Sequence, residues 1–172
     1  MGIKICVTEE LLLCLCNLKV TYMANNIKHQ LFFPHGPEQV WEYLTRAELM
    51  ELWLMPNNFL PVLGQNFQFR IKPMPQLDFD GIVYCKVLEI VPYQTLSYSW
   101  KSGPGNGKIE LDSIVVWKLI PKDNGTELLL EHTGFRGFDH SAMFSAMNEG
   151  WFKNMQKIAE LIKVANRETT KL

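Results

Sequence analysis

The sequence predicts an α+β domain in which one antiparallel sheet packs against a long helix at the carboxyl end. Between residues 66 and 133, strand-like segments follow one another almost without a break, and short turns join them. After these strands, apolar side chains recur at spacings of three and four residues, which is the period of a helix. An antiparallel sheet with one apolar face needs a covering layer, and this helix supplies it.

The length and composition indicate a single globular domain. A chain of 172 residues, 47% of them hydrophobic, can bury a core without metal ions or disulfide bonds. Its formal net charge of -1 leaves no excess of positive charge to hold a phosphate backbone, so we expect no nucleic-acid partner.

Residues 1–22 stand apart from the rest of the chain. They hold three of the four cysteines, a poor framework for disulfide bonds, which favours a reducing, cytoplasmic location. Glu9 and Glu10 interrupt the apolar run, which is too short to span a bilayer and is followed by no cleavage site, so no membrane contact is expected. Either the segment is an added amphipathic helix, or it is a disordered extension from a wrongly chosen start codon. We favour the second interpretation, because "MANNIKHQLFF" from Met23 reads as a natural start.

The first elements are one strand and two short helices. The strand is expected at Ile27–Phe33, where "PHGP" ends it. A helix begins at Pro37, whose fixed φ suits the first helical position, and the capping box "TRAE", Thr45 to Glu48, opens a second helix. This second helix ends before Pro56.

Five further strands form a meander, in which "VPYQ" and "DNGT" are short enough to join antiparallel neighbours. The dipeptide Asn124-Gly125 is the strongest hairpin signal among them. The expected strands are Asn66–Ile71, Gly81–Ile90, Thr95–Trp100, Leu111–Ile120 and Thr126–Thr133.

His132 alternates with Leu128 and Leu130, so its imidazole points to the apolar side. It is either a hydrogen-bonded core residue or a group that orients a ligand.

The last segment predicts a helix of about 25 residues from Ser141, with an apolar stripe that includes Met147 and Trp151. Gly150 lies inside it, where a glycine costs about 1 kcal/mol relative to alanine. We expect the sheet or a loop to cross the helix there and to leave no room for a Cβ atom.

The sequence contains no pattern that demands catalysis or a metal ion. The four histidines lack the spacing of zinc ligands, and no nucleophile motif is present. Cys85 alternates with valines and is interpreted as a buried structural thiol. The stretch "SGPGNGK", Ser102 to Lys108, departs from a phosphate-binding loop and is interpreted as a mobile loop that gates a cavity mouth.

Four segments in order, "VWEYLTRAELMELW", "GIVYCKVLEIVPYQTLSYSW", "SIVVWKLIPKDNGTELLLEHTGF" and "EGW", resemble the SRPBCC or START-like superfamily. Within it they are similar to the group named for the C-terminal domain of the activator of heat-shock-protein ATPase. The resemblance runs from about Ile27 to Val164. It implies a single helix-grip domain over residues 23–172, in which a curved antiparallel sheet with two short helices wraps a long C-terminal helix and leaves a cavity.

The resemblance leaves three functions open. The first is binding of an apolar or amphipathic small molecule in the cavity. The second is a chaperone-accessory role in the stress response, through surface contact with a chaperone or another protein. The third is a cyclase-like or hydrolase-like enzyme with His132 as acid or base. No catalytic residue, metal ligand or cofactor is expected. The residues expected to bind the ligand are Trp53, Tyr84, Tyr98, Trp100, Trp117, His132, Phe135, Met147 and Trp151.

Overall fold

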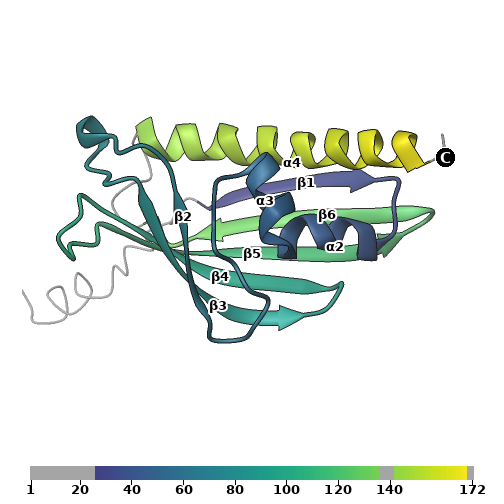
Figure 1. Cartoon of the computed structure of the whole chain (residues 1–172), viewed down its shortest axis with the longest axis horizontal. Coiled ribbons are helices and arrows are strands. Elements are labelled where there is room, and N and C mark those ends of the chain that lie inside the picture. Colours follow the sequence, from purple (N-terminus) through teal and green to yellow (C-terminus); the bar gives the residue numbers. More distant parts are fainter. Residues whose placement is uncertain (1–25, 136–141, 170–172) are drawn as a thin grey trace, which may run out of the picture.

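The computed structural model describes residues 26–135 and 142–169. It contains the six strands, two short α-helices and long carboxyl-terminal helix that the sequence predicts, and in addition one 3-10 turn (Figure 1). The expectation for residues 1–22 lies outside the described residues. The elements are β1 (Ile27–Phe33), α2 (Pro37–Thr45), α3 (Ala47–Trp53), β2 (Asn66–Arg70), η1 (Pro75–Leu77), β3 (Ile82–Val91), β4 (Thr95–Ser102), β5 (Leu111–Lys122), β6 (Gly125–Thr133) and α4 (Ala142–Thr169).

All six strands form one antiparallel sheet in the order β1-β6-β5-β4-β3-β2. The first strand pairs with the last, so that Ile27 lies opposite His132 at one end and Phe33 lies opposite Thr126 at the other. The helices α2 and α3 connect β1 to β2 at the far edge of the sheet, and α4 runs along one side of it (Figure 1). This arrangement confirms the helix-grip fold.

Two local signals in the sequence are wrong in detail. The hairpin between β5 and β6 turns at Asp123 and Asn124, because Lys122 already pairs with Gly125, and Asp123 takes the positive φ of 50°. The Thr45 hydroxyl caps no helix, because it donates a hydrogen bond back to the carbonyl of Trp41, 2.8 Å away. Arg46 therefore occupies the start of α3 without a side-chain cap.

The helix α4 is held on the sheet by a chain of hydrogen bonds that we call the histidine relay. The indole Nε1 of Trp151 donates to Nδ1 of His132 at 3.0 Å. Nε2 of His132 lies 2.8 Å from Oγ of Ser113, and that hydroxyl donates to the backbone carbonyl of Trp100 at 2.9 Å. The relay thus joins α4 to β6, β5 and β4 through side chains that are all buried.

The relay determines the tautomer of His132. An indole N–H can only donate, so Nδ1 must accept and the proton resides on Nε2, which donates to Ser113. A second proton on Nδ1 would point at the indole N–H and find no acceptor. Burial away from water also disfavours the charged ring and lowers the pKa of His132 to about 3. His132 is therefore a neutral, hydrogen-bonded core residue.

The explanation expected for Gly150 is wrong. A Cβ atom built on this residue meets no atom of the described residues within 4 Å, so neither the sheet nor a described loop crosses the helix there. Trp151, the next residue, does turn inward and is buried. The described structure gives no steric reason for a glycine at this position.

Among residues 26–135 and 142–169, no helix is both long enough and apolar enough to cross a membrane.

Replacing Gly150 with alanine should raise the free energy of unfolding by about 1 kcal/mol, because alanine restricts the unfolded chain and fits the open space. Urea denaturation of the purified variant measures this change. The matched control is Gly125→Ala, where the new Cβ would collide with the backbone oxygen of Phe33 and should destabilise the protein. A loss of stability in Gly150→Ala would contradict the open space.

The relay should make the protein less stable in acid. His132 takes up a proton near its ordinary pKa of 6.5 when unfolded but only near 3 when folded. The free energy of unfolding should therefore fall as the pH drops below about 6.5, by roughly 2 kcal/mol between pH 7 and pH 5 from this residue. Above pH 6.5 this residue adds no pH dependence.

Urea denaturation at both pH values, in the native protein and in His132→Gln, isolates this contribution. The variant should be less stable at pH 7 and should lose less on acidification. His35→Gln, at a half-buried position in the loop between β1 and α2, is the control substitution. Equal losses in the native protein and in His132→Gln would show that a charged His132 is tolerated in the folded state.

Candidate functional site

An apolar cavity of about 400 Å³ lies at the end of the grip where α4 begins. One wall comes from the inner face of β3 and β4, another from the first turns of α4, and a third from the loop that carries η1. The sheet contributes Val83, Trp100 and Ser102, the helix contributes Met143, Ala146 and Met147, and the loop contributes Ile71, Met74, Leu77 and Phe79, with Met55 beyond α3.

The η1 loop is folded back over the sheet by backbone hydrogen bonds. The amide of Met74 donates to the carbonyl of Phe79, and the amide of Ile71 donates to that of Gly81, both at 2.9 Å. Gly81 has a φ of +87°, and a Cβ there would lie 2.5 Å from the oxygen of Ile71, so only glycine fits. The amide of Asp80 donates to the carbonyl of Gly103, which ties the η1 loop to the loop after β4. The loop wall is thereby positioned over the cavity.

The stretch interpreted as a cavity gate has a more limited role. Ser102, its first residue, lines the cavity, and Gly103 anchors the η1 loop. The remaining residues to Lys108 are not among the lining residues.

Two of the nine residues expected to bind a ligand line this cavity, namely Trp100 and Met147. Most of the others form an aromatic cluster in the core between sheet and helix. In this cluster Trp117 stacks edge-on against Trp53 at 5.8 Å and against Trp151 at 5.6 Å, measured between ring centroids. The remaining members, which pack against these rings or one another, are Tyr98, His132 and Phe135.

Trp100 connects the aromatic cluster to the cavity. Its ring lies 5.2 Å from that of Trp151 and 5.7 Å from that of His132, and it also forms part of the cavity wall. The expectation that His132 itself orients a ligand does not fit this geometry, because both of its ring nitrogens are already bonded to protein groups and it is absent from the cavity wall.

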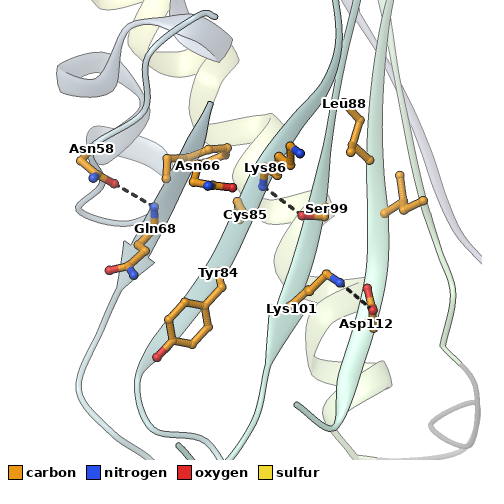
Figure 2. A pocket seen from close by; sticks show the side chains of 12 residues that line it. Asn58, Asn66, Gln68, Tyr84, Cys85, Lys86, Leu88, Ser99, Lys101 and Asp112 are labelled. Carbon is orange, nitrogen blue, oxygen red and sulfur yellow. Dashed lines mark hydrogen bonds and ion pairs between the residues drawn. The ribbon is translucent and has the colours of Figure 1, made fainter. Parts of the chain in front are cut away.

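Tyr84 was expected on the cavity side, and this placement is wrong. Alternation along β3 buries Val83 and Cys85 on the inner face, so Tyr84 points to the opposite face and is exposed. There it forms the edge of a broad hollow of about 680 Å³ on the outside of the sheet, shown in Figure 2.

Most residues that line the outer hollow are polar, and several of them are hydrogen-bonded or ion-paired with one another (Figure 2). Asn58 accepts a hydrogen bond from the amide of Gln68 at 2.8 Å, and Lys101 forms an ion pair with Asp112 at 2.8 Å. These contacts are typical of a solvated sheet face. The apolar cavity is the better candidate site because it removes ligand surface from water.

Sequence reasoning missed the η1 loop entirely. Met74, Leu77 and Phe79 lie in a stretch without helical or strand periodicity, so it was interpreted only as a connection. The available signal was its composition, since a loop with several apolar side chains needs a surface to cover. Met143, on the first turn of α4, also lines the cavity.

The cavity offers no groups for acid–base or metal chemistry in the described part of the chain. None of its lining side chains is titratable near neutral pH. Among residues 26–135 and 142–169, no group of three or more His, Cys, Asp or Glu side chains could hold a metal ion. Cys85 is buried as expected, and burial raises the pKa of its thiol, so it lacks the exposed thiolate of a nucleophile.

Comparisons with known proteins agree with this fold. The MLL2253 protein from Mesorhizobium loti, whose crystal structure is known, is 32% identical and matches with a TM-score of 0.70 over 81% of this chain and 97% of that chain. The Aha1 dimer from Colwellia psychrerythraea is 18% identical, with a TM-score of 0.65 over 80% and 96% of the two chains. BH1534 from Bacillus halodurans is 21% identical, with a TM-score of 0.63 over 81% and 99%.

No curated protein sequence matches this chain significantly. The model of one family, described as activator of Hsp90 ATPase homolog 1-like protein, matches residues 34–163. This match spans most of the chain, and the similarity to MLL2253 extends over nearly all of that protein. The chain therefore belongs to the AHSA1 family.

Proposed function

We propose that this protein binds an apolar or amphipathic small molecule in the cavity between the η1 loop and α4. The observation that carries the proposal is a cavity of about 400 Å³ that is lined by described side chains without charge. Small-molecule sites in proteins are commonly concave, largely apolar and of this size. Binding in such a cavity is favourable because the apolar surfaces of the ligand and of the cavity are removed from water.

The lining suits a ligand of variable shape. Four of the chain's eight methionines, Met55, Met74, Met143 and Met147, contribute to the wall. Methionine side chains are unbranched and polarizable, so they adjust to irregular ligands with little strain. Trp100, in the sheet wall of the cavity, packs against Trp151 of the aromatic cluster. We infer that the wall at Trp100 is rigid and that the walls with methionines adjust to the ligand.

The neutral dye N-phenyl-naphthylamine should bind with a dissociation constant on the order of micromolar and gain fluorescence. Replacing Ala146 with tryptophan should fill the cavity and weaken binding roughly tenfold or more, because this side chain lies in the wall. Ala165→Trp, near the other end of the same helix, is the matched control and should bind as the native protein does. Undiminished binding in Ala146→Trp, or none in the native protein, would refute the proposal.

A second candidate function is a chaperone-accessory role. It is favoured by a loop before β2 in which Leu60, Val62 and Leu63 are each more than half exposed. The loop is anchored to β3, because the amide of Gly64 donates to the carbonyl of Val87 at 2.9 Å. Neighbouring exposed apolar side chains mark surfaces for protein contact. The name of the family suits such a contact, and both functions suit a cytoplasmic location.

In this second case the protein should stimulate the ATPase activity of purified Hsp90. A variant with serine at positions 60, 62 and 63 should lose roughly tenfold in apparent affinity, because the apolar contact is removed. Ile120→Ser, an exposed apolar residue on the outside of the sheet, is the control, and Ala146→Trp should leave stimulation unchanged. Equal stimulation by all variants would eliminate the loop as the contact.

A further inference from the structure

We infer that the ligand of this cavity is a neutral molecule with a carbonyl group, which accepts hydrogen bonds from Trp100 and Ser102. The inference rests on the proposed small-molecule function and gives its ligand a chemical class. It begins with two polar groups in an otherwise apolar wall. Trp100 and Ser102 stand two residues apart on β4, so their side chains lie on the same face, and both line the cavity.

Both polar groups are buried without a hydrogen-bonding partner. Trp100 is 7% exposed and Ser102 is 6% exposed. Neither the indole nitrogen nor the hydroxyl oxygen makes a hydrogen bond to any residue in the described ranges. By contrast, the indoles of Trp53, Trp117 and Trp151 all donate to protein acceptors. A buried donor without an acceptor is unfavourable, so these two groups need an acceptor from elsewhere.

Trp100 and Ser102 indicate the chemistry of a ligand because both line the same cavity. The side chains of Trp41 and Ser97 are also buried without a hydrogen-bonding partner among the described residues, but neither residue lines the apolar cavity. Among the described residues, Trp100 and Ser102 are two such residues that line the same cavity. The proposed ligand offers one acceptor to both groups.

The chemistry of the donors and of the wall defines the ligand. An indole N–H can only donate, and a carbonyl oxygen has two lone pairs, so one carbonyl can accept from Trp100 and Ser102 together. No described lining residue carries a charge. A carboxylate would therefore enter without a cation to balance it, which is strongly unfavourable in an apolar site. The group that fits is a neutral ketone, aldehyde, ester or amide on an apolar body that contacts the methionines.

Trp100 and Ser102 are specificity-determining residues in this arrangement. The apolar body supplies most of the affinity, and the two donors decide which of several equally apolar molecules is retained. No bond in the ligand is made or broken.

Three probes of matched shape test the inference, namely 2-acetylnaphthalene, 2-ethylnaphthalene and 2-naphthoate. Simple partition into an apolar cavity ranks the ethyl compound first, because it is the least polar. We expect the order to be reversed, with the acetyl compound binding roughly fivefold more tightly than the ethyl compound and the carboxylate binding weakest. Isothermal titration calorimetry on the full chain measures all three.

Ser102→Ala should abolish this preference. The variant should bind the acetyl compound roughly fivefold more weakly and the ethyl compound unchanged, because one hydrogen bond is lost. It should fold as well as the native protein, since alanine removes an unpartnered hydroxyl. Ser99→Ala, on the opposite face of the same strand, is the matched control and should leave the ranking intact.

A spectroscopic signal separates hydrogen bonding from a change of shape. With the carbonyl carbon isotopically labelled, the NMR resonance of bound 2-acetylnaphthalene should lie downfield of its position in an apolar solvent, and Ser102→Ala should move it back. If the ethyl compound binds at least as well as the acetyl compound, the carbonyl inference is wrong while the cavity proposal stands. If none of the probes binds, the proposed function itself fails.

Discussion

The position of α4 on the sheet depends on one buried polar interaction, the histidine relay. Four groups on four elements must meet within hydrogen-bonding distance, from Trp151 on the helix to the carbonyl of Trp100 on β4. Apolar contacts alone tolerate sliding and rotation of a helix, whereas a buried hydrogen bond that is lost leaves polar groups unsatisfied. The relay therefore specifies one rotation and one axial position for α4. Because Met143, Ala146 and Met147 lie within the two turns before Trp151, the relay also places the helical wall of the cavity.

The inner face of the sheet is packed solidly in its middle and borders the cavity at one end. Toward the middle of the grip, Trp53, Trp117 and Trp151 pack edge-on, leaving the aromatic cluster as solid core. Toward the start of α4, Trp100 borders a cavity whose other walls include four methionines and residues of the η1 loop such as Leu77 and Phe79. A binding site thus occurs where rigid packing gives way to side chains that adapt. Trp100, Val83 and Phe79 belong both to the buried core and to the cavity wall.

The fold could be predicted from the sequence because its signals are local and repetitive. Alternation identified each strand and placed His132 inward, and the spacing of Met147, Trp151 and Met155 identified α4. The same alternation along β3 places Tyr84 outward beside Lys86, so the expectation that Tyr84 binds a cavity ligand conflicted with the strand pattern. The site was less predictable, because a cavity is formed by segments that meet only in three dimensions. An inward-facing aromatic residue has the same pattern whether it fills the core, as Trp117 does, or borders a cavity, as Trp100 does.

The pairing of β1 with β6 has a consequence for how the chain folds during synthesis. Strands β3, β4, β5 and β6 pair with neighbours in sequence and can form as soon as each emerges. β1 must wait for a partner about a hundred residues later, so its pairing carries a large loop-closure entropy and forms late. Until then β6 presents an open edge with unpaired backbone groups, including those of Leu128 and Leu130. The nascent protein is therefore most prone to aggregation before two late steps, in which β1 closes the edge of the sheet and α4 covers its apolar face.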